Sequence, residues 1–188
     1  MKVTAVATAS RVADLADGRL SGMSWWLIAL PLREAADVGV LDWATSAGCS
    51  RGVPDHLPDP QPLPTLADVL GAFQAAGCHG TPWFAVDAGS GLAQCPDPSV
   101  CQSTGGLDLG EVSLRVGGTI SGDHPLHPDA AVESMHFRKP SGAAVLHAVC
   151  ALTPVAGPIM VCHDSGGDGA FVAWPHERPE DLAADWPR

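Results

Sequence analysis

The chain of 188 residues carries 21 Asp and Glu against 10 Lys and Arg, which gives a formal net charge of −11. This surplus excludes nucleic acid as the expected partner, because phosphates would repel it, and it disfavours anionic membrane surfaces. Hydrophobic residues make up 46% of the chain, so the composition is that of a folded protein, and no run of 18 apolar residues is present to span a membrane.

The length fits one domain, which we expect to cover residues 23–175. A weakly patterned arm at 1–22 precedes it, with Met23 as an alternative start, and an acidic tail at 176–188 follows. Charged residues interrupt the first apolar stretch too early for a secretory signal. We therefore expect a cytoplasmic protein whose six cysteines are thiols and not disulfides.

The first half of the domain predicts a strand, a helix, a spacer and a second helix. A short apolar run at 25–30 indicates a buried strand. Residues 33–47 then show helical spacing of apolar side chains. Five prolines within 50–64 are incompatible with a helix or central strand, which makes this segment a stiff spacer. Thr65 follows as an N-cap, and Asp68 completes a capping box.

The second half predicts five strands, one helix and a long loop. Residues 88–109 are rich in Gly, Ser, Pro and Asp and indicate the loop. The helix begins after Ser141, its expected N-cap, and ends before Pro154. On the strand around Met135, His136 falls on the opposite face and is expected at solvent or an interface. The predicted strands are 83–86, 111–116, 131–137, 158–163 and 170–174.

This order of elements favours an α+β fold, with α/β as the alternative. Two neighbouring strands near the C-terminus form a hairpin around a glycine-rich turn, which a doubly wound parallel sheet would not contain. We expect one mixed, mostly antiparallel sheet of about five to seven strands, with about three helices packed on it.

One short motif resembles a protease active site. Residues 162–167 read Cys-His-Asp-Ser-Gly-Gly, which is similar to the segment around the nucleophilic serine of chymotrypsin-like proteases. The resemblance implies Ser165 as nucleophile, with backbone N–H groups facing an oxyanion. However, Asp168 replaces the proline that follows in that family, its histidine segment has no counterpart, and three predicted helices do not fit two β-barrels. A glycine-rich hairpin turn is the preferred interpretation.

Cysteine and histidine side chains gather around the 88–109 loop. Zinc prefers thiolate and imidazole ligands, and Cys78, His79, Cys95 and Cys101 are the candidates for such a site. The last two are further apart than the usual ligand spacing, and the first two are adjacent, which is awkward for shared ligation. A Cys95–Cys101 disulfide and two free thiols are the alternatives, and free thiols are favoured. The sequence therefore assigns no metal, no cofactor and no catalytic residue.

Tryptophans beside carboxylates supply the candidate partner-binding residues. Trp25 and its neighbour cannot both face inward on one strand, because side chains alternate. An exposed Trp close to acidic residues is typical of a binding hot spot. The C-terminal tail contains a second such combination. The candidates are Trp25, Trp186, Asp181 and Asp185.

These observations predict a small acidic protein-binding module, of inhibitor or immunity type, that neutralises a basic partner and is not an enzyme. Surplus carboxylates forming one negative patch would steer such a partner. The alternative is a metal- or thiol-dependent hydrolase that uses the cysteines and histidines near residues 88–109. A structural or assembly subunit is the second alternative, and the oligomeric state stays open.

Overall fold

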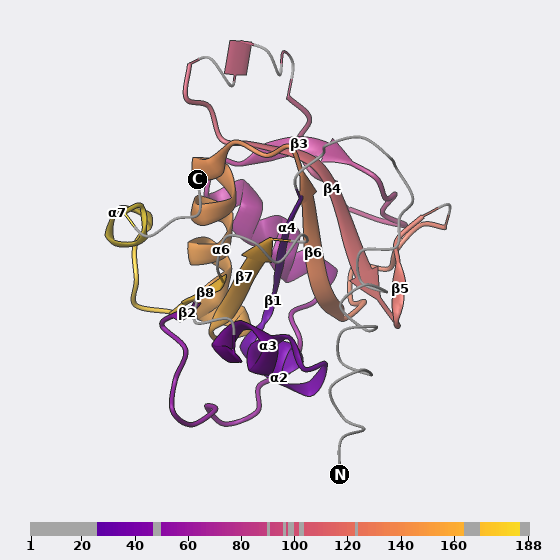
Figure 1. The fold of residues 1–188 in the computed structure, drawn as a ribbon. Coiled ribbons are helices and arrows are strands. Elements are labelled where there is room, and N and C mark those ends of the chain that lie inside the picture. Colours follow the sequence, from indigo (N-terminus) through magenta and orange to yellow (C-terminus); the bar gives the residue numbers. More distant parts are fainter. Residues whose placement is uncertain are drawn as a thin grey trace.

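The central feature of the fold is a mixed β-sheet (Figure 1). A computed structural model describes residues 26–184 apart from 47–49, 90, 96, 98–99, 102–103, 123 and 164–169. Within them the sheet order is β2 (Ser50–Arg51), β8 (Ala170–Ala173), β7 (Ile159–His163), β1 (Trp26–Pro31), β6 (Val132–Arg138), β4 (Asp108–Val116) and β3 (His79–Pro82). The short strand β5 (Thr119–Ile120) pairs with β4 outside this order.

The sheet is mostly antiparallel, as the sequence predicts. Strand β1 lies at its centre and pairs antiparallel with β6 and β7. The β4–β6 and β7–β8 pairs are also antiparallel, and β7–β8 is the predicted late hairpin, whose turn lies outside the described residues. Among the described strands, the parallel pairs are the edge pairs β2–β8 and β3–β4. The α+β class is confirmed.

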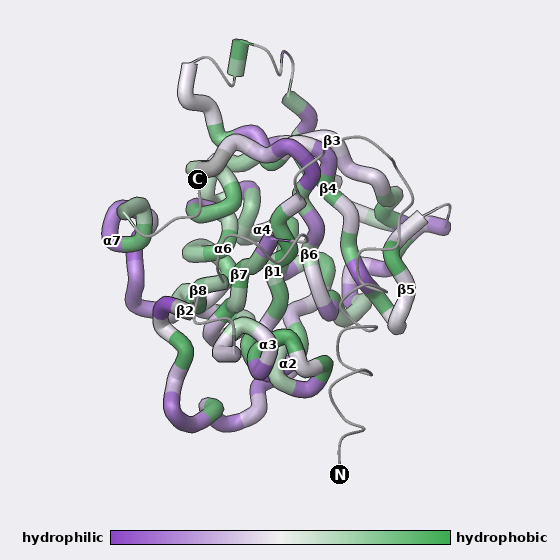
Figure 2. Tube along the Cα trace, in the orientation of Figure 1, coloured by the Kyte–Doolittle hydropathy of each residue, from purple (hydrophilic) through white to green (hydrophobic). Residues whose placement is uncertain are grey.

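Helices cover both faces of the sheet. Helices α4 (Leu66–Ala75) and α6 (Gly142–Ala156) pack on one face, which includes Leu27 and Ala29 of β1. Helices α2 (Leu32–Asp37) and α3 (Val40–Ser46) pack on the other face, against Ile28 and Leu30. Burial on both sides explains why β1 is continuously apolar instead of alternating. Figure 2 shows the hydrophobic residues concentrated in these central elements. None of the described helices is long and apolar enough to cross a membrane.

The predicted helix at 33–47 is two helices in the structure. The chain leaves α2 at Val38, and Gly39 takes a positive φ of 80° before α3 begins. A left-handed residue cannot continue a right-handed helix, and glycine adopts this conformation without the penalty of a Cβ. The prediction of one continuous helix is therefore wrong.

The N-terminus of α4 confirms the predicted capping box. Thr65 Oγ1 accepts a hydrogen bond from the Asp68 backbone N–H at 3.1 Å, and the Thr65 N–H donates to the Asp68 carboxylate at 2.9 Å. The hydrogen bonds from Thr65 also lower the pKa of Asp68. Together they satisfy backbone groups that the first turn of a helix leaves without a partner.

Replacing Thr65 with alanine is expected to lower the free energy of unfolding by about 1 kcal/mol, because the first turn loses its cap. Urea unfolding of the full chain measures the change. Thr45→Ala is the matched control: its hydroxyl bonds the carbonyl of Leu41 within α3, and its effect should stay within about 0.5 kcal/mol. Equal effects of the two substitutions would contradict a capping role for Thr65.

Helix α6 begins where the sequence predicts and ends later. Ser141 is its N-cap and accepts a hydrogen bond from the Ala144 N–H. Pro154 was expected beyond the end but lies inside the last turn. The nitrogen of Pro154 carries no hydrogen, so it cannot donate the usual helical hydrogen bond to the Cys150 carbonyl. The Thr153 hydroxyl donates to that carbonyl instead, at 2.9 Å, which explains how the helix continues past the proline.

The predicted central strand at 83–86 is wrong. The strand in this region is β3, four residues earlier and at the edge of the sheet, and Trp83 lies beyond it with 45% of its surface exposed. Gly80 and Pro82 are unfavourable in a central strand, but an edge strand tolerates them. Because the strand begins four residues earlier than predicted, His79 lies on it.

Candidate metal centre

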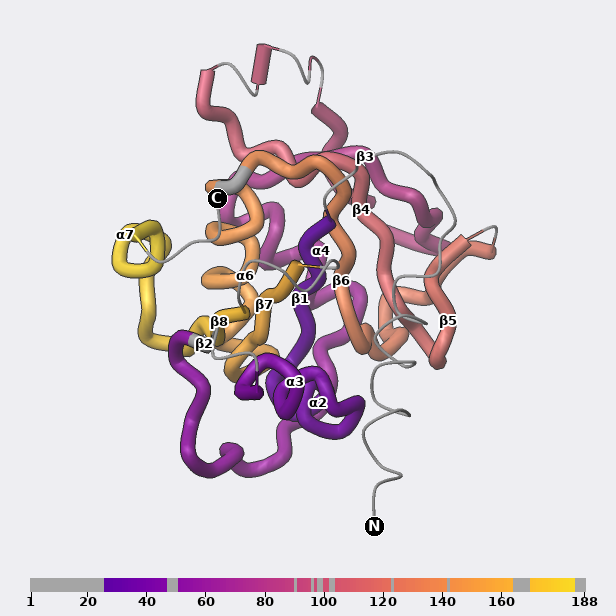
Figure 3. The backbone as a smooth tube through the Cα atoms, in the orientation of Figure 1, coloured from indigo at the N-terminus to yellow at the C-terminus, as the bar shows by residue number. Residues whose placement is uncertain are grey.

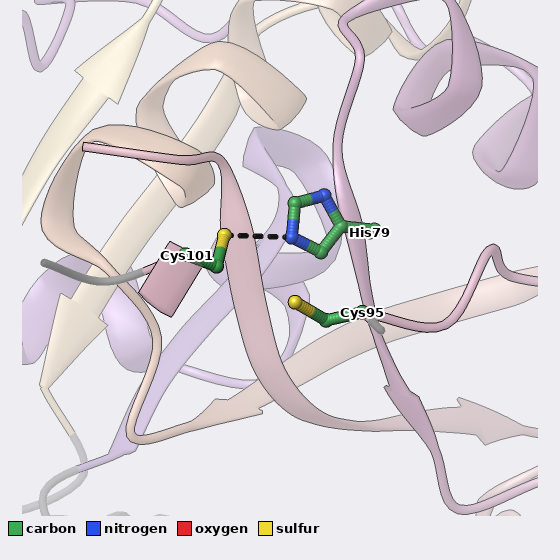
Figure 4. Close-up of side chains that lie close together, drawn as sticks. All are labelled: His79, Cys95 and Cys101. Atoms are coloured by element: carbon green, nitrogen blue, oxygen red, sulfur yellow. Dashed lines mark hydrogen bonds between the residues drawn. The ribbon is translucent and has the colours of Figure 1, made fainter. Parts of the chain in front are cut away.

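Three side chains capable of binding a soft metal converge at the β3 edge. One imidazole nitrogen of His79 and the Sγ atoms of Cys95 and Cys101 all lie within 4.8 Å of one another. His79 Nε2 is 2.9 Å from Cys101 Sγ. Figure 4 shows the imidazole and both sulfur atoms facing one another from separate stretches of backbone. All three side chains are half-buried, so the cluster is accessible from solvent.

Backbone hydrogen bonds hold these stretches against β3. The His79 N–H donates to the Leu107 carbonyl at 3.1 Å, and the Gly80 N–H donates to the Ala93 carbonyl at 2.8 Å. The second bond fixes the chain two residues before Cys95. In Figure 3 the coloured parts of the segment between β3 and β4 lie beyond this edge of the sheet. The topology thus brings a strand residue and two loop residues to one place.

Gly106 provides the space in which the Cys101 sulfur lies. A Cβ at residue 106 would overlap the Sγ of Cys101, far inside van der Waals contact. The Gly106 backbone is fixed on both sides: its N–H donates to the Cys101 carbonyl at 2.8 Å, and its own carbonyl accepts from the Ser141 hydroxyl at 3.1 Å. Because the backbone is fixed at this point, a side chain at residue 106 would have to push the Cys101 sulfur out of its place.

We expect Gly106→Ala to displace the Cys101 sulfur and to weaken metal binding by about 10- to 100-fold, the usual cost of disturbing the support of a metal ligand. A zinc titration against a chromophoric chelator measures this. Gly91→Ala is the matched control, since a Cβ there would meet no atom within 4 Å. An alanine at 106 that leaves zinc affinity unchanged would show that this packing does not position Cys101.

Cys78 does not join the cluster, which corrects the four-residue set suggested by the sequence. Its side chain is only 3% exposed, and its thiol donates to the Ala144 carbonyl of α6 at 3.5 Å. Burial raises the pKa of this thiol to about 12. Adjacent residues in extended backbone point to opposite sides, so His79 faces the loop while Cys78 faces the core.

The electrostatics of the site favour a bound cation. Partial burial raises the pKa of Cys101, and the neighbouring Cys95 thiol and the charge of Asp108 raise it further. Asp108 is buried at the start of β4, where its carboxylate accepts a hydrogen bond from the Gly110 N–H at 2.9 Å. A negative charge on the Cys101 sulfur is thus disfavoured without a counter-ion, and a divalent ion between the two sulfurs would stabilise it.

The spacing is close to that of a tetrahedral centre. Zinc–sulfur bonds of about 2.3 Å and zinc–nitrogen bonds of about 2.0–2.1 Å place neighbouring ligand atoms roughly 3.5 Å apart. The 2.9 Å between His79 Nε2 and Cys101 Sγ would therefore open by roughly 0.6 Å, a small side-chain rotation. Among the residues that the structure describes, these three are the ligands that converge, and three ligands with an open fourth position are typical of catalytic zinc sites.

The partner-binding residues suggested by the sequence lie elsewhere or outside the described residues. Asp181 is exposed on the short helix α7 (Pro179–Leu182) and bonds the Arg178 guanidinium at 3.0 Å. The hydrogen bond from Arg178 lowers the pKa of Asp181. Trp25, Asp185 and Trp186 fall outside the described residues, as does Ser165 of the protease-like motif.

Carboxylates also line a shallow cavity between α2 and the segment that precedes α4. The cavity has a volume of about 170 Å³, and its lining includes Glu34, Asp37, Asp59 and Arg33. Arg33 is 3.5 Å from Asp37 and offsets part of the charge. Burial, followed by the charges of Glu133 and Asp37, raises the pKa of Glu34. Figure 2 shows that the nearby loop between β2 and α4 is largely hydrophilic.

His136 is buried and not exposed as the sequence suggested. It does lie on the strand face opposite Met135, but it is only 2% exposed, and its Nε2 atom is 2.9 Å from the Ser134 hydroxyl. Ser113 of β4, its partner in the sheet register, is also buried. Alternation along a strand identifies the face on which a residue lies, but it does not reveal whether that face is covered.

Comparison of the chain with models of protein families, with curated proteins and with solved structures found no match in any of the three. The functional assignment therefore rests on the geometry and chemistry of the chain's own residues.

Proposed function

We propose that the reduced chain binds one thiophilic divalent ion, zinc foremost, through His79, Cys95 and Cys101. The observation that carries this proposal is the convergence of one imidazole nitrogen and two thiol sulfurs within 4.8 Å at a solvent-accessible edge of the sheet. This ligand set selects against Mg²⁺ and Ca²⁺, which prefer oxygen, and suits zinc. We place the protein in the cytoplasm, where reducing conditions keep both thiols available.

With three ligands among the described residues, an open fourth position is favoured over a purely structural zinc. A structural ion is normally enclosed by four protein ligands, whereas three ligands leave a position for water or an exogenous group. A zinc ion held by His79, Cys95 and Cys101 would supply Lewis acidity and would lower the pKa of a water bound to it. The site thus supports the metal-dependent alternative more strongly than the sequence alone did.

A zinc titration of the full, freshly reduced chain tests the proposal. The chain is made without a polyhistidine tag, stripped of metal and titrated in competition with a chromophoric chelator. We expect one zinc per chain, and a loss of affinity of more than about 100-fold in His79→Gln, Cys95→Ser or Cys101→Ser, because a direct ligand contributes more than its outer-shell support.

Cys150→Ser is the control for the loss of a thiol. Cys150 is half-buried on α6, where burial raises its thiol pKa to about 11, and it is not part of the cluster. This variant should bind zinc as the unmodified chain does. If the unmodified reduced chain took up no zinc, or if Cys150→Ser lost as much affinity as Cys101→Ser, the proposal would fail.

A second candidate function is the binding of a basic partner at the acidic cavity between α2 and the segment that precedes α4. The favouring observation is that Arg33, Arg51, Arg115, Arg138 and Arg178 each already pair with a carboxylate of the chain. Within the part of the chain that the structure describes, these arginines are therefore already engaged by carboxylates. A lysine or arginine side chain of a partner would match the charge of Glu34 and Asp59 in that cavity.

A fluorescent lysine-rich peptide tests this second candidate at low and physiological salt. Glu34→Gln and Asp59→Asn are each expected to weaken binding by roughly two- to five-fold, the size of a partly exposed ion pair, and added salt should weaken it further. Asp87→Asn is the matched control, because Asp87 is exposed away from this cavity. Equal losses in all three variants would indicate attraction by net charge alone and would contradict a defined docking site.

A further inference from the structure

We infer that Cys95 and Cys101 also form a reversible disulfide, and that its formation releases the bound ion. The metal half of this inference rests on the proposed function. The two sulfur atoms belong to the same 4.8 Å cluster, and both side chains are half-buried. Figure 4 shows the Cys95 and Cys101 sulfurs on the same side of the cluster, both close to the His79 ring. Proximity and access to solvent are what thiol oxidation requires.

The other described cysteines are poorly placed for this reaction. Cys78 and Cys162 are buried, on opposite faces of the sheet. Cys150 is half-buried on α6 and lies outside the cluster that holds the other two thiols. A protein disulfide needs a second thiol close by to resolve the mixed disulfide. Oxidation is therefore directed to the pair in the segment between β3 and β4.

The backbone permits the small movement that a disulfide needs. Cys95 lies in a stretch without helix or strand. The hydrogen bond from Gly80 to Ala93 anchors the chain two residues before Cys95 and leaves Cys95 itself outside the ladder of the sheet. Cys101 is more firmly fixed, because its sulfur lies against Gly106 and within 2.9 Å of His79. These constraints make Cys95 the attacking thiol and Cys101 the resolving thiol.

A small disulfide such as oxidised glutathione is the oxidant. The Cys95 thiolate attacks one sulfur of the reagent, forms a mixed disulfide and expels one glutathione thiolate. The Cys101 thiolate then attacks the Cys95 sulfur, forms the protein disulfide and expels the second thiolate. Two electrons pass from the protein to the reagent, and both cysteine sulfurs lose their negative charge. The ion keeps only His79 as a ligand and dissociates.

The experiment begins with zinc titration of the reduced chain, which tests the proposed function alone. The metal-free chain is then treated with oxidised glutathione, digested and mapped by mass spectrometry. We expect a Cys95–Cys101 linkage, a loss of zinc affinity of more than about 100-fold and full recovery after reduction, since two direct ligands are removed. In Cys101→Ser, the mixed disulfide should accumulate on Cys95.

The two proposals fail in different ways. A reduced chain that binds no zinc would overturn the proposed function and with it the release step. A reduced chain that binds zinc, but whose oxidation links other cysteines or leaves zinc affinity unchanged, would overturn the redox inference alone. A mixed disulfide on Cys150 instead of Cys95 in the Cys101→Ser variant would also contradict it.

Discussion

Zinc is expected to stabilise the reduced chain by about 4 kcal/mol when the free ion is present at about 1,000 times its Kd. The gain arises because the folded chain holds His79, Cys95 and Cys101 together, within 4.8 Å, while unfolding separates β3 from the segment that carries the cysteines. Urea unfolding with buffered zinc and with a chelator measures the difference. The reductant must be present throughout so that no disulfide contributes.

The variants separate a specific site from general metal binding. Cys101→Ser should lose at least about 2.7 kcal/mol of the zinc-dependent stabilisation, which corresponds to a 100-fold loss of affinity, and Cys150→Ser should retain all of it. Both replace one thiol by a hydroxyl, but only Cys101 belongs to the cluster. Stabilisation of equal size in both variants would mean that zinc acts through other groups, and the three-residue centre would be refuted.

Acid is expected to destabilise the fold through His136. Burial, together with the charge of Arg115, lowers the pKa of this imidazole to about 4 from an ordinary value of 6.5. As the pH falls below 6.5, His136 binds a proton in the unfolded chain, but in the folded chain it stays neutral until about pH 4. Stability is thus lost with falling pH across this window, by about 3 kcal/mol in total for a pKa difference of this size.

His136→Gln tests this pH dependence, because glutamine does not titrate. Unfolding of the metal-free chain is followed by urea at several pH values, and the quantity compared is the change of stability with pH and not its absolute value. Between pH 6.5 and 4, the variant should lose about 3 kcal/mol less of its free energy of unfolding than the unmodified chain does. His127→Gln is the control, since that side chain is 66% exposed. An unchanged slope in His136→Gln would contradict the burial of a neutral imidazole.

Local signals in the sequence were sufficient for much of the fold. The Thr65–Asp68 capping box is a contact within one turn, so its residues alone predict it. The apolar run of β1 and the late β7–β8 hairpin are also local patterns, and both are present in the structure. Burial of His136 was not predictable, because it depends on what packs over one face of β6.

The metal cluster was only partly visible in the sequence. Its three ligands were among the four residues considered, but the strand that orients His79 was placed four residues too late, since Gly80 and Pro82 weaken the strand pattern. Had the strand been placed at 79–82, alternation would have directed His79 and Cys78 to opposite sides. The space that Gly106 leaves for Cys101 is a tertiary contact, and no spacing in the sequence signals it.

X-ray absorption at the zinc edge of the reduced, zinc-loaded chain reports directly on which atoms hold the ion. The geometry predicts two sulfur neighbours at about 2.3 Å and one imidazole nitrogen at about 2.0–2.1 Å, with a light atom completing the shell. Cys101→Ser should show one sulfur fewer. A shell of nitrogen and oxygen atoms alone, or a shell of four sulfurs, would contradict the centre formed by His79, Cys95 and Cys101.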